Sequence, residues 1–272
     1  MSLGAKISGT GRSLGTVTVM WEQSGKVRLA RRSLVCLIAL GAFFAAWTVV
    51  RSAAGNGSDA ESYHDKLAAS YDWRFGPNPF APSNATTETG KFIPPEKFIS
   101  STRCMHCHTD VHAQWLQSAH RNAFREPFYQ KNVKDLIAQR GIAYTRHCES
   151  CHNPAALFTG ALTPNPVFKD RPFDEDGVSC IACHSIQAVN GKGIGGYVMG
   201  EPALLVREDG TKLLNVTDQE ILNDVPSHRR AMMRPLLKSP WFCAACHKSQ
   251  VPRELNDYKF IRTFPLGDEW QM

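Results

Sequence analysis

The sequence predicts a mainly α-helical domain with much irregular structure, attached to one N-terminal membrane-spanning helix. Three observations predict this architecture. The 272 residues contain four copies of the pattern Cys-x-x-Cys-His, and an uncharged apolar run precedes all four. Helical hydrophobic periodicity appears in short stretches, and Gly and Pro separate these stretches from one another.

The four copies use eight of the nine cysteines, and the pattern is typical of covalent attachment of c-type haem. In such sites two thiols bind one porphyrin edge, and the following His becomes an axial ligand of the iron. The sequence therefore predicts four covalently bound haem c groups. The predicted attachment residues are Cys104, Cys107, Cys148, Cys151, Cys180, Cys183, Cys243 and Cys246, and the predicted proximal ligands are His108, His152, His184 and His247.

Two other uses of paired cysteines are zinc binding by four thiolates and redox-active dithiols. Neither use requires a His after the second Cys, and here all four pairs are followed by one. The pattern therefore favours haem. The ninth cysteine, Cys36, lies in the apolar run and is expected to act as a small hydrophobic residue.

The apolar run Ser33–Val50 is expected to be a retained membrane anchor. As a helix it is about 27 Å long, close to the thickness of a bilayer core. Arg28, Arg31 and Arg32 precede it, and the positive-inside rule then places the N-terminus in the cytoplasm. The alternative is a cleaved signal peptide, because the small residues 52–54 resemble a cleavage site. We expect a single-pass protein of the bacterial inner membrane with its haem domain in the periplasm.

Charge is unevenly divided along the chain. The first 50 residues carry six Lys or Arg and one Glu, whereas the rest carries 25 Lys or Arg and 24 Asp or Glu. Haem propionates would make the second part neutral or acidic. Nucleic-acid binding is therefore not expected.

The chain divides into four predicted regions. Residues 1–32 form a cytoplasmic tail and 33–50 the transmembrane anchor. Residues 51–98 form a linker and a Pro-rich extended arm, because prolines there exclude long helices. Residues 99–272 form a tetrahaem cytochrome c domain. With roughly 40 residues per haem, the porphyrins are expected to supply its apolar interior.

Within the haem domain, short helices are expected after the motifs. One covers Asp110–Arg125, with Val111, Trp115, Leu116 and Ala119 as an apolar stripe. A second begins at Thr217 with a capping box and runs up to Pro226. The glycine-rich segment 190–196 is interpreted as a hairpin or loop. It does not lie in a βαβ pattern, so nucleotide binding is not expected.

The sixth iron ligands decide between an electron carrier and an enzyme, because an iron with two His ligands is saturated whereas an open iron binds small molecules. His120 would lie about 18 Å along a helix from His108, so it would serve a different haem. Met199, Met232 and Met233 are weaker alternatives, since Met usually fills core space. The candidate distal ligands, strongest first, are His120, His228, His147 and His112, with His64 and His106 behind them.

The run from Cys104 through Trp115 to His120 resembles the opening of the cytochrome c-554 family of periplasmic tetrahaem cytochromes. Gly177–His184 is similar to that family's third site, and Cys243–His247 to its fourth. The resemblance covers Ser101 to the C-terminus. It implies a mostly helical fold around stacked haem pairs, an electron-transfer role, and a distal-ligand role for His120 toward another haem. The long segment between motifs three and four departs from the family pattern.

These features together predict a membrane-anchored extracytoplasmic tetrahaem cytochrome that relays electrons between a membrane-side donor or acceptor and a periplasmic redox partner. It would act as a subunit of a larger electron-transfer complex, with a quinol-oxidising complex as one candidate partner. The alternative is a haem enzyme that reduces or oxidises a small nitrogen or sulfur species at a five-coordinate haem. Since no motif replaces the proximal His by Lys, the carrier is favoured. The ending Glu269–Met272 echoes the start of the His120 helix, so a further ligand-bearing helix is expected beyond it.

Overall fold

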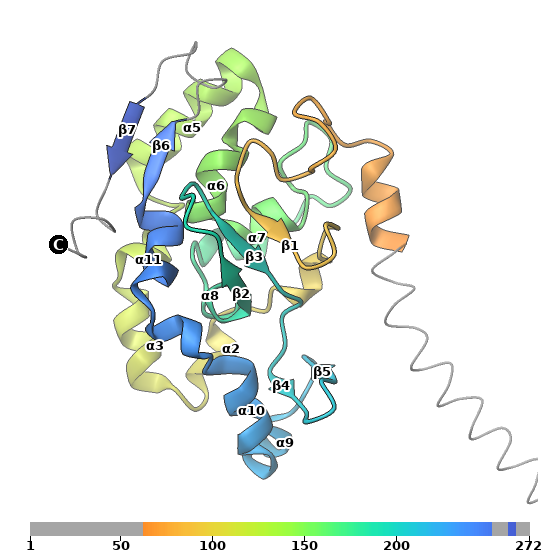
Figure 1. Ribbon diagram of the computed structural model, residues 1–272, viewed down its shortest axis with the longest axis vertical. Coiled ribbons are helices and arrows are strands. Elements are labelled where there is room, and N and C mark those ends of the chain that lie inside the picture. The colour runs from red at the N-terminus through yellow and green to blue at the C-terminus, as the bar shows by residue number, and fades with distance from the viewer. Residues whose placement is uncertain (1–61, 252–260, 265–272) are drawn as a thin grey trace, which may run out of the picture. The chain divides into compact units, whose positions relative to one another are not determined.

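Short helices and long loops dominate the computed structural model, which describes residues 62–251 and 261–264 (Figure 1). Residues 62–68 are helical. The later α-helices are α2 (Thr102–Met105), α3 (Thr109–Leu116), α4 (Ala119–Asn122), α5 (Pro127–Arg140), α6 (Arg146–His152), α7 (Pro154–Phe158), α8 (Cys180–Ser185), α9 (Asp218–Asn223), α10 (Val225–Met232) and α11 (Pro240–His247). Single 3-10 turns are η1 (Pro95–Lys97), η2 (Ile142–Thr145), η3 (Pro172–Glu175) and η4 (Pro235–Lys238). The predicted mainly helical class with much irregular structure is confirmed.

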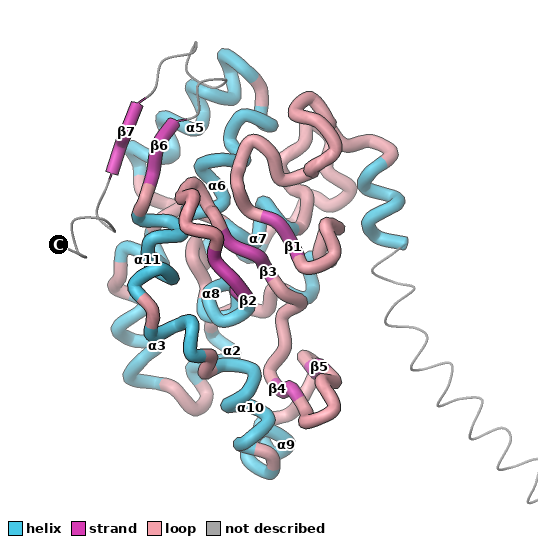
Figure 2. Tube along the Cα trace, in the orientation of Figure 1, coloured by secondary structure: helices cyan, strands magenta, loops and turns pink. Residues whose placement is uncertain are grey.

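In the described part of the chain, short strands form three small sheets (Figure 2). The central one has the order β1-β3-β2, in which β1 pairs parallel and β2 antiparallel to β3. Segment 190–196 connects β2 to β3, so the predicted hairpin is confirmed. The strands are β1 (Thr86–Thr87), β2 (Ile186–Val189), β3 (Tyr197–Met199), β4 (Leu205–Val206), β5 (Lys212–Leu213), β6 (Ser249–Val251) and β7 (Ile261–Phe264).

The core is built largely from aromatic and aliphatic side chains of the protein. Leu67, Phe80, Phe158 and Tyr197 are fully buried in one cluster. The Phe80 and Phe158 rings meet edge to face, with centroids 5.1 Å apart. The expectation that porphyrins would supply the apolar interior was therefore too strong, because it overlooked the residues before the first motif.

Those earlier residues belong to the same structural unit as the motifs. Contacts between residues group Asp59–Met272 into one compact unit. Within it, Thr86 pairs with Val198 in the central sheet, and Phe92 is buried in the core cluster. The part of the predicted arm that is described, 62–98, is thus packed into the unit that holds the motifs.

The helix predicted for Asp110–Arg125 is two helices, α3 and α4. Ser118 interrupts it, because its extended backbone ends α3 and its side chain accepts a hydrogen bond from the Arg121 amide to begin α4. The predicted apolar stripe is also wrong in part, since Val111 is 61% exposed. The buried residue of α3 is His112.

The capping box at Thr217 is confirmed, with both of its reciprocal hydrogen bonds to Glu220 present. Pro226, however, does not end a helix. Helix α9 ends at Asn223, and Asp224 caps α10 by accepting a hydrogen bond from the Ser227 amide. Pro226 lies in the first turn of α10, where its missing N–H costs nothing.

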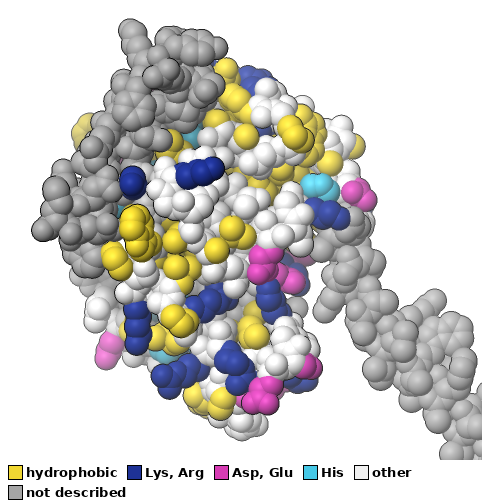
Figure 3. Space-filling view, viewed as in Figure 1, with side chains coloured by type: hydrophobic (Ala, Val, Ile, Leu, Met, Phe, Trp, Pro, Cys, Tyr) yellow, Lys and Arg dark blue, Asp and Glu magenta, His cyan; other side chains and the backbone are white. Residues whose placement is uncertain are grey.

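The predicted cytoplasmic tail and anchor, residues 1–50, lie outside the described residues. Among the residues that are described, no helix has the length and apolar character needed to cross a membrane. On the face seen in Figure 3, basic and acidic side chains are interspersed at the end that holds α9 and α10. This mixture agrees with the nearly balanced charge of the second part of the chain.

Candidate haem sites

Each Cys-x-x-Cys-His motif lies on or next to a short helix: α2, α6, α8 and α11. Residues three apart on a helix share a face, so both thiols of a motif point to the same side. Local hydrogen bonds start two of these helices. Ser179 accepts from the Ala182 amide to cap α8, and Ser239 accepts from the Trp241 amide to cap α11.

The fold brings the motifs together in pairs. The thiol of Cys104 in the first motif lies near that of Cys180 in the third, and this neighbour raises the pKa of Cys104. The thiol of Cys151 in the second motif lies near that of Cys246 in the fourth, and this neighbour lowers the pKa of Cys151. Ser101 strengthens the first pairing, because its hydroxyl accepts a 3.2 Å hydrogen bond from the Cys180 amide. All eight motif cysteines are free of disulfides.

His108 of the first motif faces His228 of α10. Their ring centroids are 6.3 Å apart and the rings are tilted by 21°. His228 also donates from Nδ1 to the carbonyl of Leu204 over 2.7 Å, which leaves the lone pair of its Nε2 for a metal. The predicted candidate His228 thus lies opposite a predicted proximal ligand.

His247 of the fourth motif faces His120 of α4, with ring centroids 6.0 Å apart. The backbone around His120 is firmly held. Its carbonyl accepts from the Val178 amide over 3.0 Å, and Trp115 Nε1 donates to the Val178 carbonyl over the same distance. Burial and the nearby His247 lower the pKa of His120, which keeps its ring neutral and able to bind a metal.

These two separations fit an iron atom between the rings. A metal–imidazole bond is about 2.0 Å long, and the ring centroid lies about 1.1 Å behind the nitrogen, so two rings bound to one metal have centroids about 6.2 Å apart. The observed 6.3 Å and 6.0 Å match this spacing. The residues present therefore fit axial coordination of haem by His108 with His228, and by His247 with His120.

The other two proximal candidates also have the hydrogen bonds typical of metal ligands. His152 Nδ1 lies 2.8 Å from the carbonyl of Ala123, and His184 Nδ1 lies 2.6 Å from that of Met232. A donor bond at Nδ1 leaves the Nε2 lone pair for the metal. Burial lowers the pKa of both rings, which again favours the neutral, ligating form.

The two weaker distal candidates are placed differently. His112 is 7% exposed, and its Nε2 is buried without a hydrogen-bond partner in the described part of the chain. An orphaned buried nitrogen of this kind fits a metal ligand. His147 instead donates from Nδ1 to the Tyr144 carbonyl, and its Nε2 lies 3.4 Å from the thiol of its neighbour Cys148. It is therefore close to its own motif.

The second motif has a distinctive polar neighbourhood. The ring of Tyr129 stacks on His152, with centroids 3.9 Å apart and planes 9° apart. This separation is too short for a metal between the two rings. Glu149, inside the motif, is 1% exposed, and burial raises the pKa of its carboxyl to about 8. The Tyr129 hydroxyl and Glu149 Oε2 are both buried next to each other, with no further hydrogen-bond partner among the described residues.

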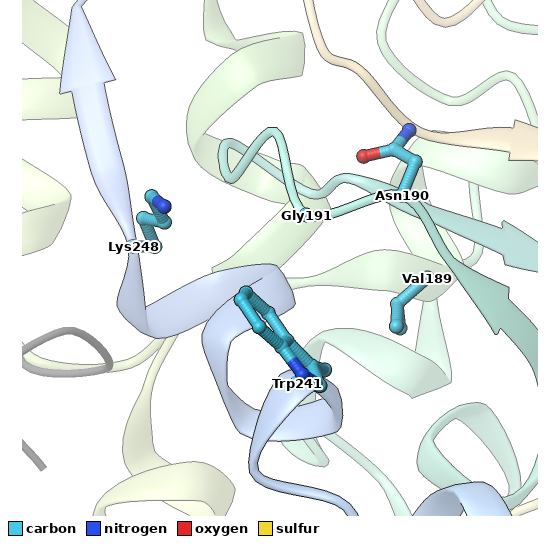
Figure 4. A pocket seen from close by; sticks show the side chains of 5 residues that line it. All are labelled: Val189, Asn190, Gly191, Trp241 and Lys248. Carbon is cyan, nitrogen blue, oxygen red and sulfur yellow. The ribbon is translucent and has the colours of Figure 1, made fainter. Parts of the chain in front are cut away.

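A hollow of about 460 Å³ opens beside the fourth motif. Trp241 and Val189 face it from different elements, and Asn190, Gly191 and Lys248 complete its lining (Figure 4).

The neighbouring Gly195 packs against the second and fourth motifs. Its amide donates to the Ala245 carbonyl over 3.0 Å, and a Cβ there would lie 2.5 Å from the Ser150 Cβ. The glycine-rich segment thus permits close approach of two motifs.

Sequence reasoning missed two arginines next to motifs. Arg103 precedes the first motif and forms an ion pair with Asp218. Arg146 precedes the second, is 1% exposed, and lies with its guanidinium carbon 4.2 Å from the Tyr71 ring centroid. Their positions, one and two residues before the first Cys of a motif, were a visible signal, but their partners lie far away along the chain.

A match to a family model supports the haem interpretation. Residues 103–185 match the family model for cytochrome c554 and c-prime. A solved structure, the penta-haem cytochrome c552 from Thermochromatium tepidum, is similar with 22% sequence identity and a TM-score of 0.38. That similarity covers 59% of this chain and 48% of the other, so the chain spans about half the length of that protein. No curated protein matches. The chain is a multihaem c-type cytochrome whose first three attachment motifs lie in a segment similar to the cytochrome c554 and c-prime family.

Proposed function

We propose that this protein is a tetrahaem electron carrier, anchored in the inner membrane by residues 33–50, with its haem domain in the periplasm. It would relay electrons between a membrane-side donor or acceptor and a periplasmic redox partner. Haem iron supplies the chemistry, because it cycles between ferric and ferrous states. The chain's own residues attach, ligate and space the groups.

The observation that carries this proposal is the facing of His108 with His228 and of His247 with His120. Two imidazoles at this spacing would saturate an iron and leave it suited to electron exchange. The pairing of motif one with three, and of motif two with four, supports haem-to-haem transfer.

The remaining two irons require ligands of their own. We assign His152 and His184 as their proximal ligands. The orphaned Nε2 of His112 makes it the favoured distal ligand for one of those two sites.

The haem assignment is tested by intact-mass analysis and electron paramagnetic resonance of the matured protein. We expect four haem additions, and low-spin ferric signals for the two sites with facing histidines. His120→Ala and His228→Ala should each convert one haem to high spin. His64→Gln is the matched control, since His64 Nδ1 accepts from the Phe92 amide and Gln preserves an acceptor. Retention of every low-spin signal in both alanine variants would contradict the ligand assignment.

The membrane location and the electron transfer are both tested on membranes that contain the full chain. Protease added to intact spheroplasts should remove the haem domain, and detergent should be needed to extract the uncut protein. A membrane-bound quinol-oxidising complex, mixed with such extracts, should reduce the haems. Release of haem protein by salt alone would argue against the anchor.

The surroundings of His152 favour a second candidate function, an enzyme acting on a small nitrogen or sulfur species. The ring stacked on His152 is that of Tyr129, and the buried polar atoms of Tyr129 and Glu149 lie beside this motif. An open iron there would bind ligands. Carbon monoxide or nitric oxide added to the reduced wild-type protein distinguishes the functions: fast binding at the haem of the second motif supports the enzyme, and no fast binding at that haem supports the carrier.

A further inference from the structure

His228 lies on a small lobe at one end of the described part of the chain. This lobe, here called the His228 lobe, consists of residues 204–233 and includes β4, β5, α9 and α10 (Figure 1). Few of its side chains are buried. Helix α9 has no buried residue, and α10 buries only Ser227 and Ala231. Weak packing of these two helices favours their local opening, whereas Leu204 and Leu214 of the same lobe lie in the core cluster.

Hydrogen bonds brace the lobe internally. His228 Nδ1 donates to the Leu204 carbonyl, and Arg230 Nε donates to the Val206 carbonyl over 2.9 Å. Asp224 caps α10 at its N-terminus. These contacts fix the His228 ring relative to its own lobe. Two further contacts tie the lobe to other parts of the unit: the Met232 carbonyl accepts from His184 Nδ1 of the third motif, and Lys212 pairs with Glu88.

The link between the lobe and the first motif is an ion-pair cluster. Arg103, one residue before Cys104, pairs with the Asp218 carboxylate at the start of α9. Arg103 NH2 also donates to the Val216 carbonyl over 2.9 Å. His106, within the motif, places Nδ1 3.1 Å from the second carboxylate oxygen of Asp218. The first motif thus contacts the lobe through α9, the first of the two helices of the lobe.

We propose that Arg103 and Asp218 form a latch that keeps His228 opposite His108 at the iron of the first haem, and that opening the latch frees the sixth coordination position for a small exogenous ligand. The inference rests on the proposed function, because it takes His108 and His228 as an axial pair. Both latch residues are positioning residues, since they act through His228. His228 would hold the iron in the closed state and release it on opening, when the Arg103–Asp218 ion pair also separates; no covalent bond of the chain changes.

Exposure of the pair sets the size of the effect. The side chains of Arg103 and Asp218 are 25% and 43% exposed, so water screens their attraction. Half-exposed pairs of this kind shift an equilibrium by about two- to fivefold. We expect Asp218→Asn to raise the carbon monoxide binding rate at the first haem by about two- to fivefold. Arg103→Gln also loses the Val216 hydrogen bond, and it should raise the rate by about tenfold.

The experiment uses the full matured chain, reduced, with carbon monoxide binding followed by stopped-flow absorbance. His228→Ala provides the reference for a permanently open first haem. Glu208→Gln is the matched control, because Glu208 pairs with Arg230 at 3.9 Å on the same lobe without reaching the first motif. The charge-swapped double variant Arg103→Asp/Asp218→Arg should return the rate toward the wild-type value. Haem content is verified by intact mass.

The outcomes separate the latch from the proposed function. If His228→Ala opens no haem, the axial pair itself is wrong. If His228→Ala opens one haem while Asp218→Asn and Arg103→Gln behave like wild type, the latch is wrong. Loss of haem from both single variants would also overturn the latch, since a latch acts only after the thioether bonds have formed. The latch would be established by three results. Carbon monoxide binds faster in Asp218→Asn and Arg103→Gln, the Glu208→Gln control keeps the wild-type rate, and the charge-swapped double variant returns toward that rate.

Discussion

The imidazole rings of His120 and His247 face each other at 6.0 Å, although one belongs to α4 and the other to α11. The spacing leaves room for one iron between them. Because Val178 and Trp115 hold the backbone of His120 in place, this distal side is rigid, in contrast to the lobe that bears His228.

Replacing the distal ligand by Met should raise one reduction potential. In His120→Met the weaker thioether ligand favours the ferrous state, as in cytochromes with Met and His ligands. We expect one of the haem potentials to rise by a fraction of the roughly 0.8 V range that axial ligands span. Spectroelectrochemical titration measures it, with His64→Met as the control. Unchanged potentials for all haems would show that His120 is not a ligand.

Adding a side chain at Gly195, where the backbone lies close to Ser150, should destabilise the protein. Its φ is +67°, and a Cβ would lie 2.5 Å from the Ser150 Cβ. Gly195→Ala therefore combines backbone strain with a steric clash, and should cost about 2–4 kcal/mol of unfolding free energy.

Gly191 supplies the matched control for that substitution. Its φ is +70°, and a Cβ added there would meet no described atom within 4 Å. Gly191→Ala should cost only the backbone strain, about 1–2 kcal/mol. Guanidinium unfolding of both variants measures the difference. Equal losses of unfolding free energy in the two variants would mean that Gly195 is not tightly packed against the second motif.

The buried Arg146 should be difficult to replace. Its NH2 donates to the carbonyls of Asp72 and Leu162 over 2.8 Å and 3.2 Å, and its guanidinium covers the Tyr71 ring. Arg146→Met leaves these carbonyls without a donor and should lower the free energy of unfolding by about 3 kcal/mol.

A lysine at position 146 tests whether charge or geometry matters. Lys keeps the positive charge but lacks the planar fork that reaches two carbonyls at once. Arg146→Lys should therefore recover less than half of the stability lost in Arg146→Met. Chemical unfolding followed by far-ultraviolet circular dichroism provides the comparison. Full recovery would assign the stability to charge alone.

Acid should weaken the latch between Arg103 and Asp218. Hydrogen bonds from His106 and Arg103 lower the pKa of the Asp218 carboxyl below its usual value of 3.8. A carboxyl whose pKa is depressed in the folded state stabilises that state above the ordinary pKa, and loses this effect as the pH falls through the lowered value.

The carbon monoxide binding rate of the wild type should consequently approach that of Asp218→Asn below pH 3.8, while the two differ at neutral pH. His106 faces the same carboxylate, so His106→Gln is measured alongside to separate its contribution. A difference between wild type and Asp218→Asn that persisted unchanged at the lowest accessible pH would contradict this linkage.

Local chemistry was readable from the sequence, whereas long-range placement was only partly so. The capping box at Thr217 was predicted correctly, because its two hydrogen bonds join residues three apart. The helix break at Ser118 was not predicted, because apolar residues recur at helical spacing on both sides of it. The boundary is set by the hydrogen bond that the Ser118 side chain accepts from the Arg121 amide. Pro226 was placed at the wrong end of a helix for a related reason, because Pro is compatible with a helix start.

At the site, helix rise predicted that His120 would serve a motif other than its own, and its ring faces His247 of the fourth motif. The partner of each histidine did not follow from spacing, because α10 and α4 reach their motifs through loops whose path depends on tertiary contacts. Asp218 was missed for the same reason, as 115 residues separate it from Arg103. Arg146 was missed because a buried Arg held mainly by carbonyls has no local sequence signature.

The burial of Leu67 in the core has a mechanical consequence. Since the helix at 62–68 already belongs to the packed unit, only residues 51–61 connect that unit to the proposed anchor. Eleven extended residues span at most about 40 Å. The haem domain would then stay within that distance of the membrane surface and would not diffuse through the rest of the periplasm. Soluble partners must come to the membrane surface to exchange electrons with it, and a donor embedded in the same membrane meets it at high effective concentration.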